Sequence, residues 1–284
     1  MDIKCFFDEN TFSFTYVVSD PLTKAAIIID PVMNFDPASG KVSSENAAIV
    51  LEYIKGHNFD LNYILETHIH ADHISAAPYF QNKLGGKTAI SKGVTEVQSV
   101  FSEVFNEGPD FKCDGSQFNI LLDDGDELTF GELTLRAMTT PGHTPACMTF
   151  IIEDSAFVGD TLFMPDFGTA RCDFPKGDAS KLYKSIQKTL SLPTNTRLFM
   201  CHDYGPNGRK ILHETRVKDQ KLSNIHIKDG VTEAEYVKMR IERDAQLSVP
   251  KLLLPSVQIN MRGGKFEPKE ENGIFYLKLP VTMT

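Results

Sequence analysis

Residues 67–73 read Thr-His-Ile-His-Ala-Asp-His and place three imidazoles and one carboxylate within six positions. Imidazole and carboxylate groups are common metal ligands in proteins. The preceding residues 61–65 are apolar and β-prone, so they predict a buried strand that ends at this cluster. At such a junction the side chains of His68 and His70 can point the same way, while those of Asp72 and His73 can reach back towards them. The segment therefore predicts a metal site.

Four further polar motifs follow strand-like runs downstream, where loops usually carry functional residues. They read Thr-Pro-Gly-His-Thr-Pro at 140–145, Gly-Asp-Thr at 159–161, Gly-Thr-Ala-Arg-Cys-Asp-Phe at 168–174 and Cys-His-Asp-Tyr at 201–204. Taken singly, each has an ordinary explanation, such as a turn histidine, a helix-capping aspartate or a core histidine. Their order after the first cluster predicts that His143, Asp160 and His202 join one site.

The composition excludes several classes of protein. The chain has 284 residues, of which 41% are hydrophobic and 24% charged, as in ordinary globular proteins. Its net charge of −9 predicts a surface that repels phosphate backbones, so no nucleic-acid partner is expected. No apolar run approaches the roughly 20 residues that span a bilayer, so no membrane segment is expected. Five cysteines without a Cys-x-x-Cys pair indicate reduced thiols and a cytoplasmic location.

Apolar periodicity and turn residues predict alternating strands and helices in one domain of residues 1–284, with a core to about 205 and an extension over 206–284. Strands are expected at 12–18, 25–30, 61–65, 87–90, at several places between 126 and 158, and at 197–201. Helices are expected around 47–56, before Gly85-Gly86, at 94–105, at 182–190, and from the capping box Thr232-x-x-Glu235 to about 246. Residues 106–117 should form an exposed loop, and the Pro- and Gly-punctuated residues 249–284 should drape over the body. The apolar residues 252–254 make a homodimer a possible assembly.

The motifs resemble the signature of the metallo-β-lactamase superfamily, His-x-His-x-Asp-His followed by His, Asp and His on successive loops. The resemblance covers about residues 12–204. Within the superfamily the chain looks most like persulfide dioxygenases, in a bacterial branch historically labelled β-lactamase-like hydrolases. The matching motifs are at 67–73, 141–145, 159–162, 171–174, 202–204 and Asn-Met-Arg-x-Gly at 260–264. This resemblance implies an α/β (α+β) fold, a four-layered αβ/βα sandwich.

The resemblance implies two alternative metal arrangements. In the two-metal layout, three histidines surround one ion, an aspartate and two histidines surround the other, and one aspartate bridges them. The residues are, in that order, His68, His70 and His143; Asp72, His73 and His202; and Asp160. Since all seven are present, a zinc-dependent thioester hydrolase of the glyoxalase II kind remains an alternative.

The persulfide dioxygenase resemblance implies one Fe(II) per chain, held by His68, His143 and Asp160 as a two-histidine, one-carboxylate triad. Zinc has no redox chemistry and could not replace iron in activating O2, although the same ligands would accept zinc in recombinant protein. The implied reaction converts glutathione persulfide, or a related low-molecular-weight persulfide, with O2 and water to a thiol and sulfite. The remaining ligand-type residues, His70, Asp72, His73 and His202, would then support the ligands through hydrogen bonds.

Four residues are candidates for substrate binding. Glutathione persulfide carries two carboxylates, and arginine forms bidentate pairs with carboxylates. Arg171 follows the aspartate of the triad in the chain, and Arg262 belongs to the Asn-Met-Arg-x-Gly stretch. Tyr16 and Tyr204 occupy positions similar to the family's substrate-contacting tyrosines. Surface ion pairs for the arginines and simple packing for the tyrosines are the alternatives.

Cys172 departs from the family's common loop, in which threonine is usual. A thiol near a persulfide could exchange sulfur, whereas the simpler alternative is a small buried side chain. A non-enzymatic, sulfide-responsive binding protein is a third hypothesis, and it would require a closed, structural metal site.

Overall fold

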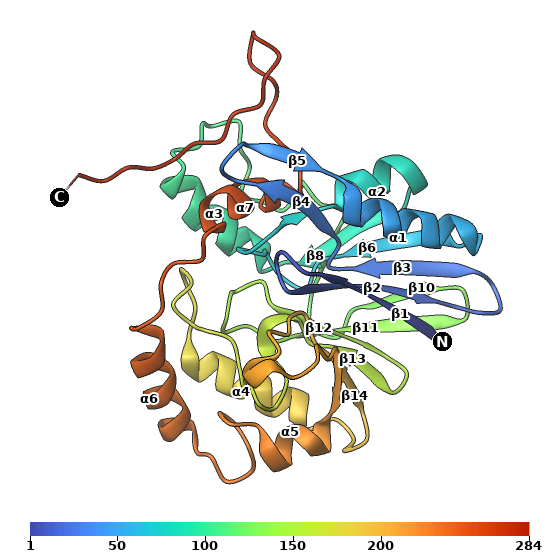
Figure 1. Cartoon of the computed structure of the whole chain (residues 1–284), viewed down its shortest axis with the longest axis vertical. Coiled ribbons are helices and arrows are strands. Elements are labelled where there is room, and N and C mark those ends of the chain that lie inside the picture. The colour runs from blue at the N-terminus through green and yellow to red at the C-terminus, as the bar shows by residue number, and fades with distance from the viewer. Residues whose placement is uncertain (284) are drawn as a thin grey trace.

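The computed structural model describes residues 1–283, which form two stacked six-stranded sheets with helices on both outer faces (Figure 1). The first sheet has the order β1-β2-β3-β6-β8-β9, antiparallel between β1, β2 and β3 and parallel from β3 onward. Its strands are β1 (Asp2–Asp8), β2 (Ser13–Ser19), β3 (Ala25–Ile29), β6 (Asp60–Leu65), β8 (Lys87–Ser91) and β9 (Ile120–Leu122).

The second sheet follows the chain order from β10 to β15, with every pair antiparallel except β13 and β14. Its strands are β10 (Glu127–Phe130), β11 (Leu133–Thr139), β12 (Met148–Ile152), β13 (Ser155–Phe157), β14 (Arg197–Phe199) and β15 (Glu214–Arg216). A small sheet of β5 (Lys41–Ser43), β4 (Val32–Asp36) and β7 (Ile74–Ser75) lies beside them.

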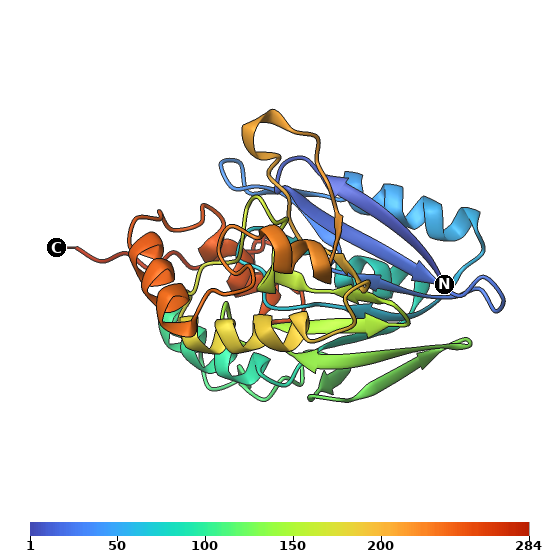
Figure 2. The same ribbon diagram turned by 90° about the horizontal axis from the view of Figure 1, so that it is seen from below.

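The helices are α1 (Glu45–Gly56), α2 (Ala77–Leu84), α3 (Val94–Val104), α4 (Ala179–Leu190), α5 (Val217–Ser223), α6 (Glu233–Asp244) and α7 (Leu253–Asn260), with 3-10 turns η1 (Gly159–Thr161) and η2 (Pro206–Gly208). Helices α1 and α2 cover the first sheet, while α4, α5 and α6 lie below the second (Figure 1 and Figure 2). Successive strand residues point to opposite faces. In β3, accordingly, Ile27 and Ile29 enter the core between the sheets and Ile28 packs under α1 and α2. The expected four-layered αβ/βα sandwich is confirmed.

The elements expected in the first 200 residues are present, often with slightly different bounds. The capping box also begins α6 as predicted, because Thr232 Oγ1 accepts from Glu235 N and the Glu235 carboxylate accepts from Thr232 N. Strand β1 and the hairpin of β4 and β5 were not predicted. Residues 106–117 form an irregular loop that is exposed only in part. No helix within residues 1–283 is long and apolar enough to cross a membrane.

The sequence predicted a C-terminal extension over residues 206–284, with residues 249–284 draped over the body, but parts of this segment are built into the sandwich. Strand β15 pairs with β14 and completes the second sheet, α6 packs beside α4, and α7 is largely buried. Helix α7 escapes a sequence-based prediction because Pro255 stands in its first turn. There proline is tolerated, since the N–H that it lacks has no partner within the helix.

Candidate metal centre

The ligand-type residues lie on loops that leave four strands. The loop after β6 carries the 67–73 cluster, the β11–β12 loop carries His143, η1 after β13 carries Asp160, and the end of β14 leads to His202. Gly159 adopts a φ of +52°, and a Cβ there would lie 2.7 Å from Thr67 Oγ1. Glycine therefore lets η1 approach the first histidine loop closely.

Asp160 lies at the centre of this convergence. Its Oδ2 is 3.8 Å from His68 Nε2 and 3.7 Å from His143 Nε2, and its Oδ1 is 3.4 Å from His202 Nε2. The ligand atoms of His68, His143 and Asp160 all lie within 4.8 Å of one another. The structure thus brings together the three residues of the expected triad, which are separated by up to 92 positions in the sequence.

Both triad histidines are oriented by hydrogen bonds at Nδ1. Thr67 Oγ1 donates to Asp30 Oδ2 at 2.8 Å and therefore accepts from His68 Nδ1 at 3.0 Å. His143 Nδ1 donates to the Arg171 carbonyl at 2.7 Å. Burial, followed by the neighbouring His70 and His143, lowers the pKa of His68 well below its usual range. Neutral rings protonated at Nδ1 present the Nε2 lone pair, the form that binds a metal.

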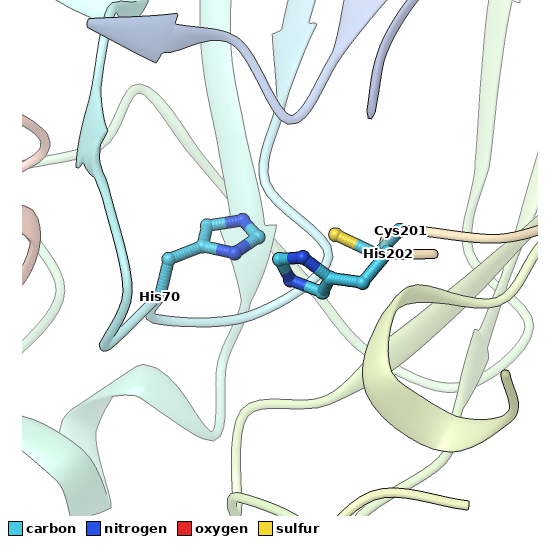
Figure 3. Close-up of side chains that lie close together, drawn as sticks. All are labelled: His70, Cys201 and His202. Atoms are coloured by element: carbon cyan, nitrogen blue, oxygen red, sulfur yellow. The ribbon is translucent and has the colours of Figure 1, made fainter. Parts of the chain in front are cut away.

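His70 is held by two buried carboxylates. Its Nε2 bonds Asp30 Oδ1 at 3.0 Å, and Glu66 Oε2 lies 3.3 Å away. Burial alone would lower the pKa of His70, but Asp30 and then Glu66 outweigh it and raise that pKa well above its usual range. Among residues 1–283, His70 Nδ1 has no hydrogen-bond partner. Figure 3 shows the His70 ring facing that of His202, with the Cys201 sulfur beside them.

The remaining ligand-type residues form a second group. Asp72 Oδ2 is 3.2 Å from His73 Nδ1 and 3.5 Å from His202 Nε2. Burial would raise the pKa of Asp72, but His202 and His73 hold it well below its usual range. His73 Nε2 and Asp160 Oδ1 are buried and make no hydrogen bond in the described part of the chain. A bound cation would satisfy these atoms, so the residues fit a metal, and both the one-ion and the two-ion layouts remain compatible with them.

Two supporting residues were not found by sequence reasoning. Asp30 accepts from Thr67 N at 2.7 Å besides its bond to His70. Ser13 Oγ lies 3.2 Å from Asp72 Oδ2 and 3.3 Å from both His73 Nδ1 and His202 Nδ1. Asp30 is the last residue of a predicted strand and directly follows β3 in the structure, so the strand-end rule applied to the later motifs would have identified it.

Helix α7 holds the histidine loop through its last residue, Asn260. Asn260 Nδ2 donates to the carbonyls of His70 (2.9 Å) and His73 (2.8 Å), and its Oδ1 accepts from Ser75 N at 2.9 Å. All three hydrogen bonds are buried, and they hold residues 70–75, which include the candidate ligands His70, Asp72 and His73. Asn260 is therefore a positioning residue for the centre.

Asn260→Ala is expected to weaken metal binding by about 10- to 100-fold, the effect typical of residues that orient ligands. The loop loses three hydrogen bonds but keeps all its ligands. Metal titration of the apoprotein measures the change, with Asn272→Ala in an exposed turn as control. Unchanged affinity in Asn260→Ala would show that the loop holds its shape without this clamp.

Helix α6 holds the loop of residues 168–174, whose Arg171 carbonyl orients His143. Arg240 is buried, pairs with Asp244 Oδ1 (Nη2 at 2.6 Å, Nε at 3.0 Å) and donates to the Thr169 carbonyl at 3.0 Å. Asp244 Oδ2 accepts from Cys172 N at 2.7 Å. The clamped residues flank Arg171, whose carbonyl orients a metal-ligand histidine. Helix α7 therefore holds the loop with the first histidines, and α6 holds the loop that orients His143.

Among the candidate substrate residues, Tyr204 lies beside the centre. Its ring stacks with that of His202 at a centroid distance of 6.0 Å and contacts Phe167 (4.6 Å) and Phe12 (5.5 Å). The side chain is 40% exposed. Partial burial of the Tyr204 side chain, followed by Asp160 and Asp72, raises its pKa, so its hydroxyl stays protonated and can donate.

Arg171 is close to the centre through its backbone, but its side chain is already engaged. The guanidinium forms a bidentate pair with Asp173 and donates to the Ser248 carbonyl at 2.8 Å. Side-chain exposure of 21% leaves it partly accessible to an anion. A substrate carboxylate at Arg171 would have to share it with Asp173.

The predictions for Arg262 and Tyr16 need correction. Arg262 is buried, pairs with Glu107 (2.6 Å) and Glu267, and lies over the Phe111 ring, so two carboxylates already neutralise its charge. Tyr16 is 2% exposed, and its hydroxyl donates to the Met200 carbonyl at 2.6 Å. Its position on β2 directs it between the sheets, so it serves packing and cannot reach a ligand from solvent.

The thiols near the centre are in their unreactive, protonated form. Burial raises the pKa of Cys172 and, to about 12, that of Cys147. Burial, followed by Asp30, raises the pKa of Cys201 well above its usual range. Because the thiolate is the nucleophile and metal ligand, these environments favour the structural alternative for Cys172.

Comparisons with known proteins agree with this geometry. A family model of the metallo-β-lactamase superfamily matches residues 9–202. A probable metallo-hydrolase of Burkholderia pseudomallei is 51% identical over 99% of both chains, and Glyoxylase B2 of Dictyostelium discoideum is 49% identical over 93% of this chain and 91% of its own. The human persulfide dioxygenase ETHE1 is 30% identical over 92% of this chain and 88% of its own. The crystal structure of ETHE1 from Myxococcus xanthus superposes with a TM-score of 0.74, at 27% identity, over 93% of this chain and all of the other.

The family model covers more than half of the chain, and the seven residues of the family's ligand pattern converge at the loops described above. The relatives include both hydrolase-type and persulfide dioxygenase names. The chain belongs to the metallo-β-lactamase superfamily.

Proposed function

We propose that this protein is an Fe(II)-dependent persulfide dioxygenase that oxidises glutathione persulfide, or a related low-molecular-weight persulfide, to sulfite. The observation that carries the proposal is the grouping of His68, His143 and Asp160, with all ligand atoms within 4.8 Å. Two histidines and one carboxylate on one face are typical of non-haem iron oxygenases. The similarity to persulfide dioxygenase ETHE1 over 92% of the chain supports it.

Iron bound by this triad would supply the redox chemistry that activates O2 beside the persulfide. One persulfide anion, one O2 and one water give one thiol, one sulfite dianion and one proton. The two atoms of O2 are reduced, the terminal sulfur of the persulfide is oxidised, and the sulfur–sulfur bond is broken.

The protein's own residues orient the ligands and the reactants. The Nδ1 hydrogen bonds to Thr67 and to the Arg171 carbonyl hold the two ligand rings in position. Tyr204, with Phe12 and Phe167, forms an aromatic wall on the side of His202. We propose that the Tyr204 hydroxyl donates to the bound persulfide and that Arg171, despite its bond to Asp173, contacts a carboxylate of the thiol carrier.

The free thiols are consistent with a cytoplasmic setting, which we include in the proposal. All five cysteines lie in the described residues and none forms a disulfide. Such a state is usual where cellular reductants keep thiols reduced.

Oxygen uptake by anaerobically purified protein tests the proposal. With glutathione persulfide we expect O2 consumption, an equal amount of sulfite, and about one iron per chain in metal analysis. The same protein reconstituted with zinc should consume no O2, because zinc has no accessible second oxidation state. Iron-loaded protein that consumes no O2 with any persulfide would contradict the proposal.

A zinc-dependent thioester hydrolase is the second candidate. This function is favoured by His73 Nε2 and Asp160 Oδ1, which are buried and make no hydrogen bond within the described residues. A second metal ion could bind both atoms. The relative named Glyoxylase B2 supports it as well. Two zinc ions per chain with rapid hydrolysis of S-lactoylglutathione would establish this alternative.

A further inference from the structure

The C-terminal arm, residues 265–283, carries a row of exposed apolar side chains. It leaves α7, makes a tight turn in which Glu270 N bonds the Ile274 carbonyl, and projects away from the sandwich (Figure 1). Gln258 anchors its middle through two bonds to the Lys278 backbone, at 2.9 and 3.0 Å. Its exposed apolar residues are Ile274, Phe275, Tyr276, Leu279, Val281 and Met283.

An apolar groove of about 1020 Å³ lies between this arm and the body of the protein. The hairpin of β4 and β5 forms one wall through Phe35 and Val42, and the start of α7 contributes Leu253 and Leu254. The arm itself forms the other wall. Val42 and the arm residues are exposed, so the groove and the arm together present a continuous apolar surface. Monomeric proteins seldom leave such a surface in contact with water.

The charge of the arm argues for a second copy of this chain as its partner. Residues 265–283 contain three lysines and three glutamates and so carry no net charge, whereas the whole chain carries −9. Two copies repel each other over most of their surface, but an arm without net charge can approach another copy. An arm and a groove of the same apolar character on one chain are self-complementary, as a two-fold interface requires.

We propose that two copies of this chain form a dimer by reciprocal docking, in which the apolar arm of each copy packs into the groove of the other. The dimer interface extends towards the metal centre. Phe35 and Pro37 line both this groove and an adjoining pocket of about 400 Å³, and that second pocket reaches His73. An arm docked from the second copy would therefore cover the outer side of a path to the centre.

Sedimentation velocity on the full chain tests the proposal. The apparent molecular mass of the wild type is expected to be twice the 31.7 kDa of one chain. An arm variant, Val281→Asp with Met283→Asp, changes two exposed arm residues that do not line the groove. This variant and a groove variant, Val42→Asp, should each raise the dimer dissociation constant at least about 100-fold. A charge buried in an apolar interface costs several kcal/mol. Leu22→Asp, which charges an exposed turn between β2 and β3, serves as the matched control and should leave the dimer intact.

Mixing the two variants separates reciprocal docking from other assemblies. In a mixed dimer the intact arm of the groove variant meets the intact groove of the arm variant, so the mixture should dimerise more tightly than either variant alone. Circular dichroism and thermal melting check that each variant is folded. A monomeric wild type, a dimer that both variants leave unchanged, or a mixture no tighter than its components would overturn the proposal.

Discussion

Asp160→Asn is expected to remove metal binding and activity together. The substitution keeps the size of the side chain but removes the carboxylate that lies 3.7 to 3.8 Å from His68 Nε2 and His143 Nε2. Residues that only orient ligands contribute about 10- to 100-fold to metal affinity, so loss of a ligand should cost at least about 100-fold. The two histidines that remain leave the divalent ion without its negatively charged ligand.

Metal content after anaerobic purification and dialysis measures this effect, and O2 uptake with glutathione persulfide gives the corresponding activity. Asp123→Asn is the control, because Asp123 is an exposed carboxylate that pairs with Lys92 on the surface. Iron retained at one ion per chain in Asp160→Asn would show that the triad is assigned wrongly. Loss of metal accompanied by unfolding, seen by circular dichroism, would instead assign Asp160 a structural role.

Asp244→Ala is expected to destabilise the protein by about 3–5 kcal/mol, the usual cost of removing one partner from a buried ion pair. The Arg240 guanidinium would stay buried and lose the carboxylate that accepts two of its hydrogen bonds. Cys172 N would lose its acceptor as well. The loop around Arg171 should loosen, so metal affinity should fall together with stability.

Urea unfolding of the metal-free protein measures the change in the free energy of unfolding separately from the change in metal affinity. Glu242→Ala is a closely matched control, because Lys238 and Glu242 form a pair with the same spacing on the same helix, but in solvent. That exposed pair should contribute at most about 1 kcal/mol. Equal losses in the two variants would mean that burial of the Arg240–Asp244 pair has no special weight.

Much of the candidate centre could be predicted from the sequence because ligand chemistry is local. A metal site needs particular side chains, and four of the seven candidates occur at 68, 70, 72 and 73 in one short segment that follows a recognisable strand. The later ligands each follow another strand, so the ends of strands packed in one sandwich predict their convergence. The same local signals, alternation in strands and apolar spacing in helices, predicted the strands and helices themselves, whereas the four-layered arrangement was implied by the resemblance to the metallo-β-lactamase superfamily.

The support of the centre could not be predicted, because it depends on contacts between distant parts of the chain. Asn260 bonds carbonyls about 190 positions earlier, and Asp244 bonds a backbone N–H 72 positions earlier. Neither contact produces a periodic pattern in the sequence. Because of Pro255, the residues of α7 were predicted to be part of an irregular tail. The partners of arginine and tyrosine also depend on packing, and so Arg262 was wrongly expected to face a substrate and Tyr16 to be accessible.

The sequence by itself determined the set of ligand-type residues and the alternation of strands and helices, since both follow from residue type and spacing along the chain. Only the tertiary structure decided that His70 is bound by Asp30 and Glu66 and that Arg171 shares its charge with Asp173. It also decided that α7 holds the histidine loop and that α6 holds the loop that orients His143. The physical reason is that hydrogen-bond partners and burial depend on which segments meet in space. Those partners and that burial determine which nitrogen of each histidine ring is free to bind a metal, and they set the pKa of each group.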